Sequence, residues 1–101
     1  MSDDEIVVTV EAGLADLVPT FLANCRAHAL KLRAAAAAGD LAAATSIGHN
    51  LAGSGTSYGF DRVSELGREI ERLAKGADAR AVGQLAQQLE NYLARVRAVS
   101  G

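Results

Sequence analysis

One histidine, His49, lies in the middle of an uncharged segment of the chain. From Leu41 to Phe60 there is no Asp, Glu, Lys or Arg, although 22% of the whole chain is charged. A neutral imidazole is a nucleophile near neutral pH. Any chemistry that this segment performs is therefore expected to centre on His49.

The spacing of apolar residues predicts that the His49 side chain faces solvent. At about 100° per residue, an apolar stripe forms along one side of a helix, and His49 lies on the opposite side. The helical neighbours of His49 are all small, so a partner could reach the ring. The stripe consists of Ile47, Leu51, Ser54 and Tyr58, and the small neighbours are Thr45, Ala52, Gly53 and Thr56.

Four glycines, Gly48, Gly53, Gly55 and Gly59, lie in or next to this predicted helix. Each glycine inside a helix costs about 1 kcal/mol relative to alanine, so a close approach of a backbone or a ligand is expected. Gly53 shares the face of His49 and would meet a visiting partner. For Gly48 and Gly55 two alternatives remain open, close packing of a neighbouring helix and contact with a partner.

The segment from His49 to Phe60 resembles the signature of histidine-containing phosphotransfer (HPt) domains, found in bacterial two-component phosphorelays. That signature has an apolar residue two positions after the histidine, often a lysine three positions after it, then Gly-Ser, small residues, an apolar or aromatic residue and a glycine. The matching residues are Leu51, Gly53, Ser54, Tyr58 and Gly59. Ala52 departs from the signature, because many members have a lysine there that attracts the phosphoryl group.

The resemblance implies a phosphorelay intermediate. His49 would accept a phosphoryl group through its Nε2 from the aspartate of a response-regulator receiver domain and pass it to another receiver. A hybrid histidine kinase is a further expected partner. Phosphoryl transfer depends mainly on positioning and charge neutralisation, and the receiver would bring Mg²⁺. The chain itself would need no cofactor and would be a phosphocarrier without kinase or phosphatase activity of its own.

Six residues around His49 are expected to contact the phosphoryl group or the partner. They are Thr45, Asn50, Ala52, Gly53, Ser54 and Thr56. Because position 52 has no lysine, a cation from the preceding helix is expected to support the phosphoryl group, from among Arg26, Lys31 and Arg33. The alternative for each of these basic residues is an ordinary solvated helix face.

The segment around His49 has no acidic residue, and the nearest ones are Asp40 and Asp61 at the far ends of the helix. We therefore expect no carboxylate beside the ring, which would protect a phosphohistidine from hydrolysis. A lone exposed histidine is also a poor metal site, since zinc takes three or four protein ligands. His28 and Cys25 share an apolar stripe of the preceding helix. Cys25 is expected to be a small core residue, and His28 a partly buried histidine with one hydrogen bond rather than a second phosphoacceptor.

The composition indicates one cytoplasmic domain. A chain of 101 residues supports a single modest core. Its net charge of −2, with both signs interspersed, gives no nucleic-acid footprint. One cysteine fits a reducing compartment, and no apolar run approaches the roughly 18 to 20 residues of a membrane span. The acidic start is unlike a secretory signal. We expect a monomer.

Periodicity and capping residues predict an all-α fold, an antiparallel up-and-down four-helix bundle over residues 1–101. The expected helices start near 16–18 and end near 38, then cover 41–57, 61–75 and 78–96, and short connections make neighbours antiparallel. Residues 5–10 are rich in β-branched side chains. With no second strand-like run to pair with, residues 1–13 are expected to form a short extended N-terminal arm on the bundle.

Two other functions remain open. The chain could bind receivers without carrying phosphate, as a regulatory bundle. It could also be a structural helical adaptor that does not interact with receivers.

Overall fold

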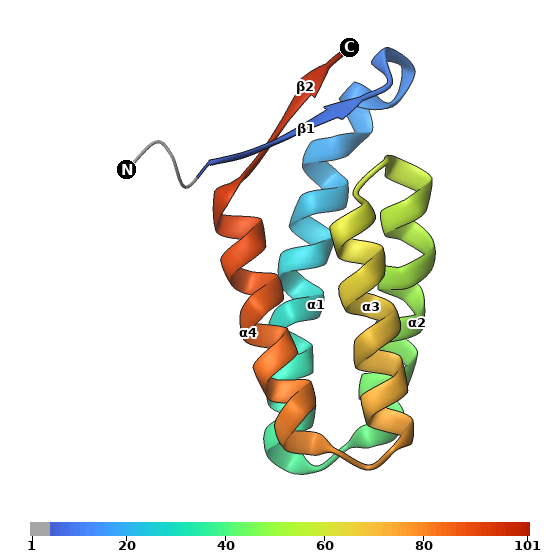
Figure 1. Ribbon diagram of the computed structural model, residues 1–101, viewed down its shortest axis with the longest axis vertical. Helices are drawn as coiled ribbons and strands as arrows, with labels where there is room; N and C mark the ends of the chain where they lie inside the picture. Colours follow the sequence, from blue (N-terminus) through green and yellow to red (C-terminus); the bar gives the residue numbers. More distant parts are fainter. Residues whose placement is uncertain (1–4) are drawn as a thin grey trace.

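A computed structural model describes residues 5–101 of the chain. Within that range four α-helices form a bundle, each running antiparallel to the next, with two short strands at one end (Figure 1). The predicted helical bundle is confirmed. The helices are α1 (Val18–Ala38), α2 (Leu41–Tyr58), α3 (Asp61–Lys75) and α4 (Ala79–Arg95); the strands are β1 (Ile6–Val10) and β2 (Val96–Ser100), and a 3-10 helix, η2 (Ala12–Leu17), precedes α1.

The sequence signals set most helix boundaries. Pro19 lies in the first turn of α1, where its missing N–H is tolerated. The carboxylates of Asp40 and Asp78 accept hydrogen bonds from backbone N–H groups in the first turns of α2 and α4, at 3.2 and 3.0 Å. Asp61 is the first helical residue of α3, and Phe60 takes the capping position. An acidic side chain in the first turn still complements the helix dipole.

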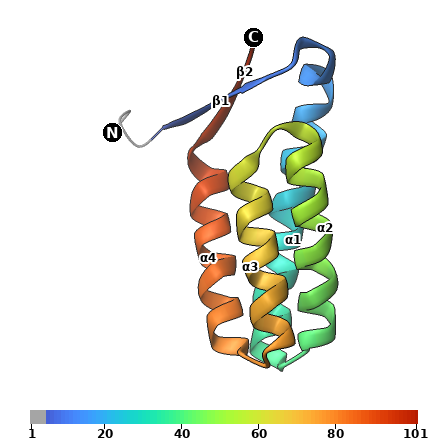
Figure 2. The ribbon, with the colours of Figure 1, turned by 45° about the vertical axis from the view of Figure 1, so that its right-hand side comes forward.

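The N-terminal arm has a partner strand, contrary to the prediction. β1 pairs in parallel with β2, from Ile6 opposite Val96 to Val10 opposite Ser100, and Arg97 forms an ion pair with Glu5 at 3.0 Å. Val96 was expected in the fourth helix, but α4 ends at Arg95. A run as short as residues 96–100 fits helical and strand spacing equally, so periodicity alone could not separate them. Figure 2 shows the two strands extending beyond the helices, close to one end of the bundle.

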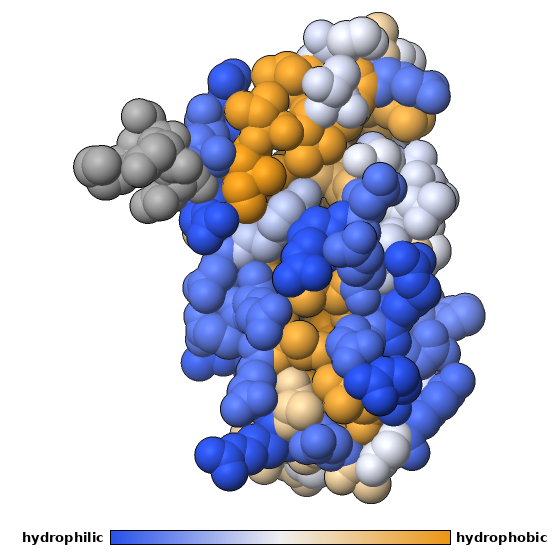
Figure 3. Space-filling view, in the orientation of Figure 1, coloured by the Kyte–Doolittle hydropathy of each residue, from blue (hydrophilic) through white to orange (hydrophobic). Residues whose placement is uncertain are grey.

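Aromatic and aliphatic side chains fill the core. Phe21 of α1 stacks on Tyr58 of α2 with ring centroids 4.7 Å apart, and Phe60 lies 5.1 Å from the same ring of Phe21. The largest fully buried apolar side chains are Phe60, Leu32, Leu51, Ile70, Leu89, Val63 and Val82. Hydrophilic side chains cover most of the face in Figure 3, and hydrophobic residues reach the surface there at the strands and along the seam between helices.

Helices α2 and α3 pack backbone against backbone. A Cβ on Gly48 would lie 2.8 Å from the carbonyl oxygen of Gly67, and a Cβ on Gly67 would lie 2.5 Å from the amide nitrogen of Ala52. We call this contact, formed by Gly48, Gly55, Ser64 and Gly67, the glycine seam. Ser64 is buried in it, and its hydroxyl donates to the backbone carbonyl of Ala52 at 2.7 Å. A Cβ on Gly55 would lie 2.5 Å from the hydroxyl oxygen of Ser64. Of the two alternatives for Gly48 and Gly55, helix packing is the one that the structure shows.

Candidate functional site

The ring of His49 lies on the outer surface of α2. Its side chain is 75% exposed, as the helical wheel predicted. The space beside it is open, because a Cβ built on Gly53 would meet no atom within 4 Å. The buried line of α2 consists of Ala44, Gly48, Leu51 and Gly55, a slightly rotated version of the predicted stripe. An incoming group can therefore approach the imidazole directly from solvent.

A carboxylate lies next to His49, contrary to the prediction that none would. Oε2 of Glu71, on α3, is 3.4 Å from Nδ1 of His49. This separation is longer than a normal N–H···O hydrogen bond, so the contact is mainly electrostatic in this state. Glu71 is 22 residues further along the chain, and the glycine seam between α2 and α3 brings it beside the ring. The contact directs Nδ1 toward the protein and leaves Nε2 as the outward nitrogen.

Glu71 is itself held by a lysine. Nζ of Lys75, one turn further along α3, lies 3.2 Å from the same Oε2 of Glu71. Hydrogen bonding from Lys75 holds the pKa of the Glu71 carboxyl below its usual range, against the opposite effect of desolvation, and His49 adds a smaller lowering. The carboxylate is therefore ionised at neutral pH, and the same carboxylate oxygen lies close to both the imidazole of His49 and the ammonium group of Lys75.

The six residues expected around His49 divide between two sides of α2. Ala52 and Thr56 line the side next to α3, where the hydroxyl of Thr56 lies 2.8 Å from that of Ser64 and the backbone of Ala52 accepts from Ser64. The hydroxyl of Thr45 donates to the backbone carbonyl of Leu41 within α2 at 2.7 Å. Asn50 and Ser54 line the groove toward α1 instead. The hydroxyl of Ser54 donates to the backbone carbonyl of Asn50 at 2.9 Å. Gly53 lies between them on the exposed face. The structure thus gathers only part of this set around the imidazole.

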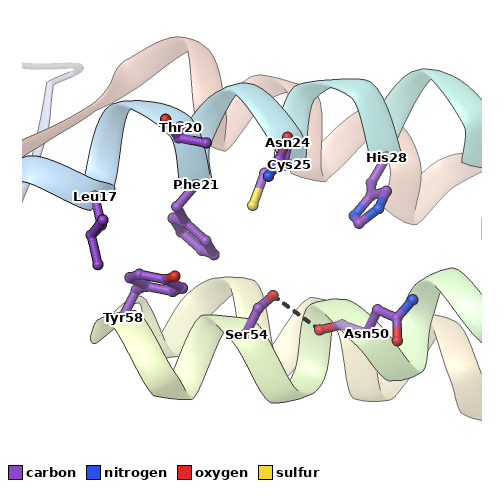
Figure 4. A pocket seen from close by; sticks show the side chains of 9 residues that line it. All are labelled: Leu17, Thr20, Phe21, Asn24, Cys25, His28, Asn50, Ser54 and Tyr58. Carbon is purple, nitrogen blue, oxygen red and sulfur yellow. Dashed lines mark hydrogen bonds between the residues drawn. The ribbon is translucent and has the colours of Figure 1, made fainter. Parts of the chain in front are cut away.

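An uncharged groove of about 490 Å³ separates α1 from α2 (Figure 4). Leu17, Phe21 and Tyr58 make one end of it apolar, and His28 and Asn50 make the other end polar. Its remaining lining residues are Thr20, Asn24, Cys25 and Ser54. Since Asn50 directly follows His49, the groove adjoins the exposed face that carries the imidazole.

A family model described as the Hpt domain matches residues 16–99 of this chain. That match spans the whole bundle, the His49 segment and most of β2. The chain belongs to the Hpt domain family. Histidine phosphotransfer within two-component phosphorelays is the function of this family, whose members work with receiver domains and kinases as phosphocarrier modules. Searches of curated proteins and of solved structures gave no match.

Two of the three cations expected to support the phosphoryl group of this Hpt domain lie elsewhere. Arg33 forms an ion pair with Glu90 of α4 at 3.1 Å, and Arg26 borders a hollow with Glu90 and other residues of α4. Lys31 lines a hollow between α1 and α2, near the loop that joins them, together with Asp40 and Ile47. The first two lie along the contact between α1 and α4, because their positions on α1 point away from α2.

Sequence reasoning missed Glu71 and Lys75. A signal for them was present, because Ser64, Gly67 and Glu71 recur at three and four residues on α3 and include two small residues. Small residues at this spacing indicate a close helix contact. Pairing them with Gly48 and Gly55 in an antiparallel arrangement would have placed Glu71 near His49.

The described part of the chain, residues 5–101, contains no group of three His, Cys, Asp or Glu side chains that could hold a metal ion. In the same range no helix is long and apolar enough to cross a membrane. His28 is half-buried in the groove and Cys25 is buried, as predicted. Among residues 5–101 the side chain of His28 has no hydrogen-bond partner, contrary to the expected single hydrogen bond.

Proposed function

We propose that this Hpt domain is a phosphorelay intermediate that carries the phosphoryl group on Nε2 of His49. It accepts the group from the aspartyl phosphate of one receiver domain and passes it to the aspartate of another. The observation that carries this proposal is the exposed ring of His49 with its Nδ1 against Glu71. A nucleophile with one nitrogen held by the protein and the other free is suited to in-line attack.

The transfer step needs no proton to move. With the proton on Nδ1, the lone pair of Nε2 attacks phosphorus, the bond between phosphorus and the aspartate oxygen breaks, and the aspartate leaves as a carboxylate. The phosphorylated ring keeps its Nδ1 proton and carries a positive charge, which the Glu71 carboxylate stabilises. The same step in reverse passes the group from Nε2 to the aspartate of a second receiver. Mg²⁺ at the receiver's own acidic site would neutralise the phosphoryl oxygens.

The docking face consists of the exposed side of α2 around His49 together with the adjoining groove between α1 and α2. Neither the His49 segment nor the groove lining carries an Asp, Glu, Lys or Arg, so an apolar part of a receiver can cover them without burying an unpaired charge. Transient signalling contacts are modest in area. A modest contact of that kind suits a partner that must bind, exchange a phosphoryl group and leave.

Incubation with a panel of phosphorylated receivers tests the proposal, with wild type compared with His49→Gln. Wild type should gain an acid-labile phosphate and His49→Gln should gain none. Receiver binding by both proteins without any phosphate on His49 would instead indicate a regulatory bundle. No interaction with any phosphorylated receiver would indicate a structural adaptor and would overturn the proposal.

A further inference from the structure

We propose that Arg68 of α3 is the cation that binds the phosphoryl group during its transfer to and from His49. This inference rests on the proposed function, because it concerns the same reaction at the same imidazole. Arg68 is exposed and was not among the residues expected at the site.

The reaction needs a cation that α2 cannot supply. A phosphoryl group carries a charge of about −1.5 to −2 near neutral pH, and charge neutralisation is a main part of its transfer. No Lys or Arg occurs in α2 between Leu41 and Tyr58. A cation on this side of the transferred group must therefore come from a neighbouring helix. Helix α3 approaches the His49 segment most closely, through the glycine seam.

Arg68 follows a residue that packs directly on the His49 segment of α2. Gly67 contacts the backbones of Gly48 and Ala52, which lie next to His49 and one turn after it. Arg68 follows Gly67 and precedes Glu71 by three residues, so Arg68 and Glu71 lie on the same side of α3. Figure 1 shows that α2 and α3 are antiparallel. Going back along α3 from Glu71 to Arg68 therefore corresponds to going forward along α2 from His49 toward Gly53, where the space is open.

The charges around Arg68 are already paired with one another. Along α3, Arg62 binds Glu65 at 3.3 Å, Arg72 binds Glu69, and Lys75 binds Glu71 at 3.2 Å. No ion pair within residues 5–101 involves Arg68, although a carboxylate lies three residues away on either side. Its guanidinium is therefore free to bind an incoming anion. Two parallel N–H groups of an arginine match two phosphoryl oxygens.

Lys75 has a different part at the same site. Its ammonium group is bound to Glu71, so it acts on His49 through that carboxylate and is a positioning residue. Arg68 differs in that no protein group competes for it. The geometry thus assigns orientation of the ring to Glu71 and Lys75, and capture of the phosphoryl group to Arg68.

The test compares Arg68→Gln, Arg68→Lys and a matched control, Arg72→Gln, on the same exposed helix. Transfer from a phosphorylated receiver to His49 should slow about ten-fold or more in Arg68→Gln, because a hydrogen-bonded charge is lost. Arg68→Lys should restore part of the rate, since the charge remains but the two-pronged geometry does not. Arg72→Gln should stay within about two-fold of wild type, as exposed ion pairs contribute little. Circular dichroism should show the same helical content in all four proteins.

A second measurement separates contact with phosphate from a general effect of charge. The ³¹P resonance of phosphorylated His49 titrates with pH, and a neighbouring guanidinium favours the more highly charged form. The midpoint of this titration should therefore move to higher pH in Arg68→Gln and stay unchanged in Arg72→Gln. A normal transfer rate and an unchanged midpoint in Arg68→Gln would overturn the inference while leaving phosphorylation of His49 intact. If wild type itself gains no phosphate, the proposed function fails instead.

Discussion

Nδ1 of His49 and Oε2 of Glu71 lie 3.4 Å apart, although 22 positions separate them in the chain. The contact fixes which ring nitrogen faces the protein, and its partner Lys75 keeps the carboxylate ionised. In the proposed transfer the attacking nitrogen, Nε2, must be both exposed and unprotonated. A proton on Nδ1 facing Glu71 would leave Nε2 in that state, with one side chain from each of two helices.

Replacing Glu71 with glutamine should slow phosphoryl transfer to His49 about three- to ten-fold without unfolding the bundle, because the amide cannot stabilise the charged phosphorylated ring as a carboxylate does. ¹⁵N NMR of the imidazole should at the same time show a mixture of the two tautomers. Glu65→Gln on the same helix is the control and should leave both readouts unchanged. Equal transfer rates in wild type and Glu71→Gln would remove the role given to this carboxylate.

An arginine at Gly53 should block the docking face. Its side chain would project into the open space next to His49, so transfer should fall about ten-fold or more while the melting temperature stays near that of wild type. Gln84→Arg, at an exposed position of α4, adds the same charge far from α2 and serves as the control. Rapid transfer by Gly53→Arg would show that receivers dock elsewhere.

The glycine seam should tolerate no methyl group. In Gly48→Ala the new Cβ would lie 2.8 Å from backbone atoms of Gly67 and Glu71, so the helices must separate, at a cost of about 1–3 kcal/mol. Gly53→Ala in the same helix meets nothing and should raise the free energy of unfolding by up to about 1 kcal/mol. Urea denaturation measures both changes. Equal stability of the two variants would contradict backbone packing between α2 and α3.

Acid should destabilise the bundle through His28. Burial, with a smaller effect of Lys31, lowers the pKa of this imidazole below its ordinary value of 6.5. The unfolded chain therefore binds more protons than the folded one below about pH 6.5, so the full stability contribution is present above that pH and is lost as pH falls through the folded value. His28→Gln should show a smaller drop in melting temperature than wild type between about pH 7.5 and about pH 5.

Two comparisons check that interpretation. Lys31→Gln should keep most of the wild-type pH dependence, because burial is the larger cause of the shift. An identical pH dependence in wild type and His28→Gln would mean that other groups set the acid sensitivity of the bundle.

The sequence predicted the helices and the exposure of His49 because both depend on local spacing. Apolar periodicity and the capping residues Asp40 and Asp78 are readable within a few turns of chain. Glu71 could not be found that way, since its position depends on how two helices pack. The pairing of β1 with β2 was missed for a similar reason, because the two strands come from opposite ends of the chain and neither is long enough to be distinctive.

The close fit of Gly48 against Gly67 means that substitutions at two parts of the surface have different effects: those next to His49 and those in the groove between α1 and α2. Main-chain packing sets how near α2 and α3 bring the imidazole and the carboxylate, and Lys75 of α3 also holds that carboxylate. Neither depends on the residues that line the groove between α1 and α2. In the proposed relay, substitutions in that groove can therefore shift partner preference while the contact of His49 with Glu71 stays the same.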